Sequence, residues 1–184
     1  YGVRVQVYLG RGVQIDGGGI PVMHSRIATR RPWARILWEQ TALPWALRKS
    51  GADVLHAPAF VAPLAAGCPS VVTAHDLSFL RYPEMFRAGN RLYLRTFTGP
   101  SCRRAAAVIA LSAFAAQEIT RLLGVPAERI VVVHPGVAPR FHPIDEATVS
   151  EFRRRKQLPE RFVLFLGTLE PRKNLIRLIR AYAL

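Results

Sequence analysis

Short apolar runs recur along the chain, and the segments between them have a helical rhythm. Four of these runs are long enough for strands buried on both faces: residues 54–56, 71–74, 108–111 and 130–133. Strands joined by helices in this way are parallel, with right-handed connections. We therefore predict that the four runs are neighbouring parallel strands of one sheet, within an α/β, Rossmann-like doubly wound fold.

The segment between the last two runs shows the pattern most clearly. Its apolar side chains are expected to share one helix face: Phe114, Ile119, Leu122 and Leu123. Ser112 directly follows a predicted strand, so its side chain is expected to cap this helix by accepting a first-turn N–H. The helix is expected to end at Gly124, in a left-handed conformation.

Other segments predict further elements of the first part of the chain. Residues 3–9 alternate between apolar and polar and predict a strand. Residues 32–49 predict a helix that Pro44 should kink or divide, since proline lacks an N–H and crowds the preceding turn. The Gly10-Arg11-Gly12 run begins like a dinucleotide-binding fingerprint, but Ile15 stands where the third glycine belongs, so we interpret the run as a flexible connector.

The 184 residues suffice for one domain and part of another. After the first domain, Asp145 is expected to cap a helix over residues 145–157, residues 162–166 predict a buried strand, and an amphipathic helix follows residue 174. One strand and one helix cannot bury themselves. We therefore predict a Rossmann-like domain over 1–140, a linker and helix over 141–160, and the truncated first βα unit of a second Rossmann-like domain over 161–184.

The formal charge of +14 suits nucleic acid, anionic lipid or a phosphorylated ligand. Basic residues cluster at 103–104 and 153–156, but no nucleic-acid-binding motif accompanies them, so binding of nucleic acid is not favoured. A solvated arginine-rich surface is the simplest interpretation, and peripheral contact with an anionic membrane is the alternative. The sequence has no uncharged apolar run of about 18 residues, so no membrane span is predicted.

Cys68 and Cys102 match no metal-binding or redox spacing. They predict two buried thiols in a reducing cytoplasm, and no bound metal is expected.

Polar side chains stand where the predicted strands end. Ligands of parallel α/β sheets bind beyond the carboxyl ends of the strands, and His56, His75 and Ser112 are placed there. For each histidine a structural and a functional role are both open. Asp76 either orients His75 or contacts a hydroxyl-bearing ligand, or else it caps residues 77–78 as a loop aspartate.

A second candidate site lies between the predicted strand at 162–166 and the final helix. Gly167 allows a ligand to approach the backbone, and Asn174 can cap the helix, whose first N–H groups favour an anion. Arg172 and Lys173 add two positive charges, as a diphosphate group requires when no metal neutralises it. The alternative interpretation is a solvated basic turn.

Three stretches, residues 71–86, 105–137 and 162–184, together resemble family 4 glycosyltransferases of the GT-B fold. The similarity is greatest to the bacterial mannosyl- and glucosyltransferase-like branch. The resemblance implies two Rossmann-like domains with a cleft between them. It implies a nucleotide diphosphate sugar donor bound mainly by the C-terminal domain, an acceptor bound mainly by the N-terminal domain, and transfer that retains anomeric configuration without a metal.

The resemblance also assigns roles by position. Lys173 matches the lysine that contacts the donor phosphates, and His75 matches the histidine that faces the reacting sugar. Ser112 and Gly136 match cleft-lining positions, which His56 is expected to share. Many members have an arginine where this chain has Thr168, and the family's paired-glutamate motif would lie beyond the last residue, so the sequence resembles an internal piece of an enzyme.

We interpret the chain as part of a retaining glycosyltransferase of polysaccharide biosynthesis. It would move a hexose from a nucleotide diphosphate sugar to a glycan or lipid-linked acceptor, in the cytoplasm or at the inner face of the membrane. One alternative is another GT-B enzyme, such as a nucleotide-sugar epimerase. The other is a non-catalytic basic α/β module that binds nucleic acid or anionic membrane.

Overall fold

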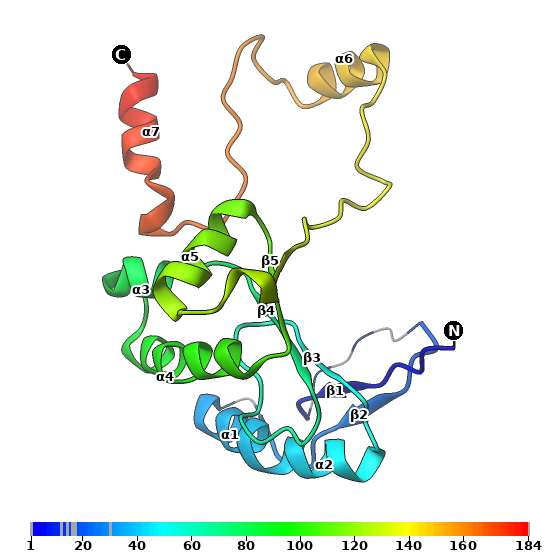
Figure 1. Cartoon of the computed structure of the whole chain (residues 1–184). Helices are drawn as coiled ribbons and strands as arrows, with labels where there is room; N and C mark the ends of the chain where they lie inside the picture. The colour runs from blue at the N-terminus through cyan, green and yellow to red at the C-terminus, as the bar shows by residue number, and fades with distance from the viewer. Residues whose placement is uncertain (1, 12, 14, 16–17, 30, 184) are drawn as a thin grey trace. The chain divides into compact units, whose positions relative to one another are not determined.

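The computed structural model describes residues 2–11, 13, 15, 18–29 and 31–183 (Figure 1). The chain divides into two compact units, residues 1–134 and residues 135–184. The elements of the first unit are β1 (Val7–Leu9), β2 (Val22–His24), α1 (Pro32–Leu37), η1 (Trp38–Ala42), α2 (Leu43–Ser50), β3 (Leu55–Ala57), β4 (Ser70–Ala74), α3 (Ser78–Arg81), η2 (Pro83–Met85), α4 (Ala88–Arg104), β5 (Ala107–Ala110), α5 (Ala113–Leu123), η3 (Ala127–Arg129) and β6 (Ile130–Val132). Those of the second are α6 (Glu146–Arg155), η4 (Pro171–Lys173) and α7 (Leu175–Tyr182).

The main sheet of the first unit has the strand order β3-β4-β5-β6, and every pair is parallel. The four predicted strands are therefore confirmed as neighbours in one sheet. Helix α4 connects β4 to β5, and helix α5 connects β5 to β6, which gives two successive strand–helix–strand units. Because the strands are parallel, all four carboxyl ends lie at the same edge of the sheet.

A second, two-stranded parallel sheet pairs β1 with β2, with Val7 opposite Val22. The strand predicted over residues 3–9 is present in its last three residues, whereas β2 was not predicted. Gly10 follows β1 at a close contact, since a Cβ there would lie 1.8 Å from Oγ1 of Thr29. In the predicted connector over residues 10–12, Gly12 lies outside the described residues.

The core of the first unit is formed by apolar side chains of β4, β5, α3, α4 and α5. Helix α5 contributes Ala115, Ile119 and Leu123, which are spaced four residues apart and form one buried row. Phe114 and Leu122, predicted on this face, are 66% and 39% exposed. That part of the prediction is wrong because each precedes a buried residue by one position, a rotation of about 100° around the helix.

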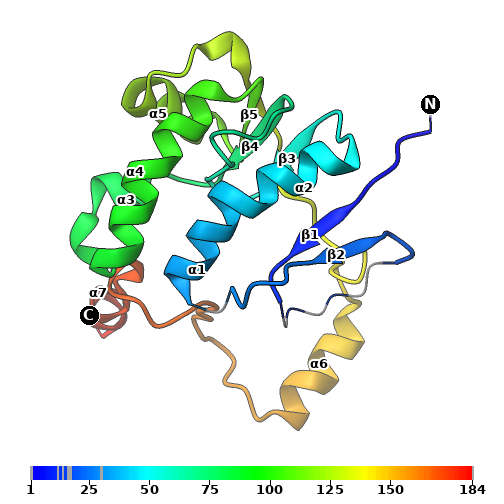
Figure 2. The ribbon, with the colours of Figure 1, turned by 90° about the horizontal axis from the view of Figure 1, so that it is seen from below.

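The predicted helix ends are confirmed where the sequence carried a specific signal. Ser112 accepts a hydrogen bond from the backbone N–H of Ala115 at 3.1 Å, and Gly124 ends α5 with φ +68°. The helix predicted over residues 32–49 is continuous in backbone conformation, but the π-helical segment η1 interrupts its α-helical hydrogen bonding directly before Pro44, which lies in the first turn of α2. Figure 2 shows the three segments following one another as a single rod.

In the second unit, Asp145 caps α6 as predicted, by accepting the N–H of Thr148 at 2.8 Å. The strand predicted over residues 162–166 is wrong, since this stretch pairs with no strand in the described part of the unit. The backbone of a strand needs a hydrogen-bonded partner strand. Without one, the apolar side chains of this stretch are exposed to solvent, and Leu166 is 95% exposed. Only the helical half of the predicted βα unit is formed. The predicted domain boundaries stay predictions.

No helix in the described ranges is both long enough and apolar enough to cross a lipid bilayer.

Candidate functional site

The polar side chains predicted for the first unit lie in or shortly after the strands of the main sheet, and His134 takes a similar position. His56 lies within β3, His75 follows β4, Ser112 follows β5, and His134 follows β6. Ligands of parallel sheets bind at the carboxyl edge. It is therefore the candidate site of the first unit.

His56 is exposed, and its ring is hydrogen-bonded to the neighbouring strand. Its Nε2 lies 2.9 Å from Oγ1 of Thr73 on the neighbouring strand. Thr73 is buried, so its hydroxyl needs this partner. Sequence reasoning missed Thr73, although its position two residues beyond Val71, which pairs with His56, places it on the same face of the sheet.

His75 is exposed and held by the loop that follows β3. Its Nε2 lies 2.8 Å from the carbonyl oxygen of Pro58, and its ring centroid lies 5.4 Å from that of Phe60. Pro58 and Phe60 were not identified from the sequence. They contact His75 only because β3 and β4 are adjacent in the sheet.

Asp76 makes the helix-start contact that was one of its predicted roles. Its Oδ1 accepts the backbone N–H of Ser78 at 2.8 Å and the hydroxyl of Ser78 at 2.5 Å. Both bonds hold the first turn of α3, and among the described residues no hydrogen bond joins Asp76 to His75. A role toward a ligand stays a prediction for this carboxylate.

Ser112 and His134 each bond a backbone group near the end of β5. Ser112 uses its hydroxyl oxygen to cap α5, and the neighbouring carbonyl of Leu111 lies 3.2 Å from Nδ1 of His134. Gly136 belongs to the second unit, and a side chain at its position would meet no atom within 4 Å. The cleft-lining role predicted for Ser112 and Gly136 stays a prediction.

The predicted phosphate loop is organised by Glu170. Its carboxylate accepts the hydroxyl of Thr168 at 2.9 Å and Nε of Arg172 at 2.5 Å. The hydrogen bond from Arg172, followed by that from Thr168, lowers the pKa of Glu170. The positive charge of Arg172 is thus balanced inside the loop, whereas the ammonium of Lys173 has no side-chain hydrogen bond or ion pair within the described residues.

Two residues of this loop differ from the expected geometry. Gly167 has φ +157°, and a Cβ there would lie 3.1 Å from the ring of Phe165, so the ring already occupies part of the space expected for a ligand. Asn174 was predicted to cap α7 with its side chain, but it does not. Its own backbone is left-handed, with φ +53°. Its carbonyl instead accepts the N–H groups of Arg177 and Leu178.

Metal-binding groups do not gather in the described residues, where no cluster holds three or more histidine, cysteine, aspartate or glutamate side chains. Both cysteines are free. Cys102 is fully buried as predicted, and burial raises its pKa to about 11, whereas Cys68 is only half-buried.

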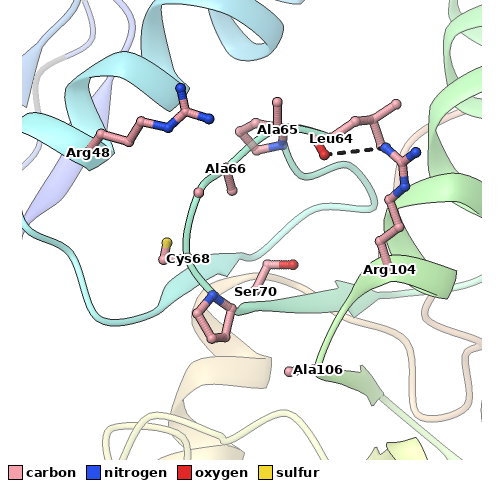
Figure 3. A pocket seen from close by; sticks show the side chains of 11 residues that line it. Arg48, Leu64, Ala65, Ala66, Cys68, Ser70, Arg104 and Ala106 are labelled. Atoms are coloured by element: carbon pink, nitrogen blue, oxygen red, sulfur yellow. Dashed lines mark hydrogen bonds between the residues drawn. The ribbon is translucent and has the colours of Figure 1, made fainter.

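A cavity of about 390 Å³ lies at the opposite edge of the sheet, beside Ser70 at the start of β4 and Ala106 before β5 (Figure 3). Arg48 and Arg104 border it, but Nη1 of Arg104 donates to the carbonyl of Leu64 at 3.3 Å. Figure 3 shows the two guanidinium groups on opposite sides of the loop that carries Leu64, so they do not converge on one ligand position.

The geometry defines a class: an α/β domain with a parallel sheet and polar side chains at the carboxyl edge. Two solved structures share its fold. The structure of Anabaena Alr3699/HepE in complex with UDP matches with a TM-score of 0.61 and 21% identity, over 89% of this chain and 44% of that chain. The structure of the same protein in complex with UDP-glucose matches with a TM-score of 0.51 and 20% identity, over 78% and 38%. The α/β, GT-B-related fold class is confirmed.

The sequence profile of Glycosyltransferase Family 4 matches residues 2–141, and the chain belongs to that family. The O-antigen chain mannosyltransferase B of Escherichia coli is 32% identical over 141 residues, which cover 76% of this chain and 37% of that protein. The serotype-specific mannosyltransferase WbdA of Escherichia coli is 35% identical over 83 residues, 44% of this chain and 10% of that protein. The chain therefore spans well under half the length of these relatives, and the resemblance read from the sequence is confirmed.

Proposed function

We propose that the chain forms the acceptor side and the beginning of the donor side of a retaining glycosyltransferase. The enzyme would transfer a hexose from a nucleotide diphosphate sugar to a glycan or lipid-linked acceptor. The observation that carries the proposal is the exposed imidazole of His75, held at the carboxyl edge of the sheet in a family 4 chain. The mannosyltransferase relatives and the UDP and UDP-glucose complexes of the fold neighbour support this substrate class.

On the donor side, the chain's own groups suit a diphosphate leaving group. Charge grows on the phosphate as the glycosidic bond breaks, and fixed donors stabilise that charge. Lys173 supplies an ammonium that makes no side-chain hydrogen bond or ion pair within the described residues, although its charge interacts with the nearby carboxylate of Glu170. The first N–H groups of α7 are not capped by the side chain of Asn174. No metal is required in this proposal, because the cationic loop takes its place.

On the acceptor side, His75 would face the reacting sugar, and His56 and Ser112 would be the other ligand-facing positions of the first unit. Gly136 would keep the cleft-lining role that the family resemblance implies. Asp76 would act next to His75 by fixing the start of α3, through the bonds to Ser78. The chemistry suits recognition of hydroxyl groups, since imidazole nitrogens form directed hydrogen bonds with them.

The basic clusters support a location at the inner face of the membrane only in part. Arg103 donates to the carbonyl of Leu123 at 3.1 Å, and Arg153 donates to the carbonyl of Pro159 at 3.0 Å, so two of these arginines fix backbone within their own units. Arg154, Arg155 and Lys156 are the exposed members of the second cluster that would meet anionic lipid.

The test uses the full-length protein with a panel of nucleotide sugars that includes UDP-glucose and a mannose donor, with and without glycan and lipid-linked acceptors. Acceptor-dependent transfer, with the anomeric configuration of the product read by NMR, is the expected result. Conversion of the sugar without any acceptor would instead show an epimerase. Binding to anionic vesicles or nucleic acid with no reaction of any donor would favour a non-catalytic module.

Two variants separate the halves of the site. His75→Ala should impair transfer with little loss of nucleotide affinity, and Lys173→Ala should impair both. Lys49→Ala is the matched control, because it removes the same charge from a lysine that lies over the ring of Trp45, far along the sequence from the loop. Equal effects of Lys173→Ala and Lys49→Ala on donor affinity would refute the donor-side assignment.

A further inference from the structure

The loop that follows β3 is held against the end of β4 by two hydrogen bonds, and a third closes a turn within the loop. The N–H of Phe60 donates to the carbonyl of Thr73 at 2.9 Å, and Nε2 of His75 meets the carbonyl of Pro58 at 2.8 Å. The N–H of Val61 donates to the carbonyl of Ala59 at 2.7 Å, which closes a three-residue γ-turn around Phe60. His75 is thus joined to Pro58 across 17 positions of sequence, and the N–H of Phe60 is joined to the strand that precedes His75.

Phe60 occupies a backbone conformation that its side chain disfavours. Its φ is +62°, a region that glycine enters readily and a bulky residue rarely enters. A γ-turn with positive φ at its centre is the rarer and more strained of the two forms. Strain of this kind persists only where the surroundings over-determine it, and it clusters at functional sites.

The ring of Phe60 shows what holds the strained turn. It lies 5.4 Å from the imidazole of His75, at 58°, and 6.1 Å from the ring of Phe79, at 85°. Phe79 is almost fully buried in the core, so Phe60 connects the exposed imidazole to a fixed point. The backbone strain is therefore offset by aromatic packing and by the bond to Thr73.

The bond to Pro58 also decides which nitrogen of His75 carries the proton. A carbonyl oxygen can only accept, so Nε2 must be the donor. In the neutral imidazole, Nδ1 is then unprotonated and can accept a hydrogen bond. His134 is held in the opposite way, because its Nδ1 faces the carbonyl of Leu111 at 3.2 Å.

We infer that Phe60 is a positioning residue for His75. Its γ-turn presents the carbonyl of Pro58, which holds the imidazole with Nε2 protonated and leaves Nδ1 to accept a hydrogen bond from a hydroxyl of the bound sugar. The nature of that ligand rests on the proposed function, whereas the state of the imidazole does not.

The first experiment needs no substrate. In protein labelled with ¹⁵N-histidine, at a pH where the imidazoles are neutral, long-range ¹H–¹⁵N spectra report which ring nitrogen is protonated. His75 should show a single tautomer in which Nε2 is protonated and its proton exchanges slowly with solvent. His134 should show the other tautomer, with Nδ1 protonated. The variants His75→Phe and His134→Phe assign the two sets of signals. An averaged, rapidly exchanging His75 in the wild-type protein would overturn the inference.

Two substitutions of Phe60 separate backbone from ring. Glycine accepts positive φ, so Phe60→Gly should keep the turn and the single state of His75, whereas the β-branched side chain of Phe60→Val should open the turn and release the imidazole. If both variants keep the wild-type spectrum, the turn does not position His75. If Phe60→Val does not fold, the wild-type and Phe60→Gly spectra still decide the question.

Activity of the full-length protein gives the second readout. Phe60→Val and His75→Phe should each lower turnover by about 10- to 100-fold, and the double variant should lose no more than the worse single variant, because Phe60 acts through His75. Additive losses would show a structural role and overturn the inference. If the NMR results hold but no donor reacts, positioning of His75 stands and the proposed transferase function fails.

Discussion

Two buried hydroxyl groups lie three residues apart on α4, and their removal should change stability in opposite directions. Thr98 is fully buried, and its Oγ1 has no hydrogen-bond partner among the described residues. Ser101 is also buried, but its Oγ accepts the N–H of Ala62 and donates to the carbonyl of Ala62, both at 3.1 Å. The pair shares a helix and a core, so only the bonding differs.

The expected magnitudes follow from that bonding. Leaving a buried polar group unpaired costs about 1–3 kcal/mol, so Thr98→Val, which replaces the hydroxyl by a methyl group of similar shape, should stabilise the chain by about 1 kcal/mol. Helix propensity hardly changes, because valine and threonine rank together. Ser101→Ala should destabilise by about 1–3 kcal/mol, since it leaves the backbone N–H of the buried Ala62 without a partner. The carbonyl of Ala62 would keep only the longer hydrogen bond from Nε2 of Gln40, at 3.5 Å.

The measurement is urea unfolding followed by tryptophan fluorescence. Trp33, Trp38 and Trp45 all belong to the first unit, so the signal reports its unfolding. An unchanged slope with a shifted midpoint identifies a change in stability. A gain of about 1 kcal/mol should also raise Tm by about 2–4 °C. Destabilisation by Thr98→Val, or a neutral Ser101→Ala, would refute the reasoning.

Three further predictions concern charge and thiols. Lys173→Ala in the full-length protein should weaken donor binding by about 10- to 150-fold, because a charge-assisted hydrogen bond contributes about 1.5–3 kcal/mol; calorimetry measures this, and an unchanged affinity contradicts it. Hydrogen bonds from Arg81 lower the pKa of Glu118, so the carboxylate stabilises the fold above its unfolded pKa and loses that effect as pH falls through its lowered folded pKa. Glu118→Gln should thus shift the urea midpoint downward at pH 7, with a gap to wild type that closes in acid; a gap that is independent of pH would argue against the ion pair. At pH 8 a thiol reagent should modify Cys68 in the folded chain and Cys102 only after unfolding, since burial raises the pKa of Cys102 to about 11 and excludes the reagent; equal reaction rates would contradict this.

Helix ends could be predicted from the sequence because their causes are local. The hydroxyl of Ser112 reaches an N–H three residues away, and the carboxylate of Asp145 does the same. Gly124 and Pro44 act through their own backbone conformation and the adjacent turn. These residues therefore have the same effect in almost any tertiary setting.

Strands could be predicted only in part, because a strand forms only where a neighbouring strand satisfies its backbone hydrogen bonds. The runs that became β3, β4, β5 and β6 are mutually adjacent and satisfy one another's backbone groups. An equally apolar run at 162–166 has no partner in the described part of its unit and stays unpaired. Residues 22–24 form only a short apolar stretch after Pro21, which does not by itself predict a strand, yet they form β2 by pairing with β1.

For the candidate site, the sequence by itself determined which side chains stand at the ends of the strands: His75, Asp76 and Ser112 follow apolar runs whose length sets where each strand stops. The tertiary structure alone decided what these groups contact. Pro58 meets His75 because the register of β3 on β4 brings their loops together. Nothing in the identity of Phe60 predicts a positive φ, since phenylalanine alone disfavours it. That conformation is stabilised by a carbonyl and two aromatic rings from residues 13 or more positions away, and such contacts exist only once the sheet has formed.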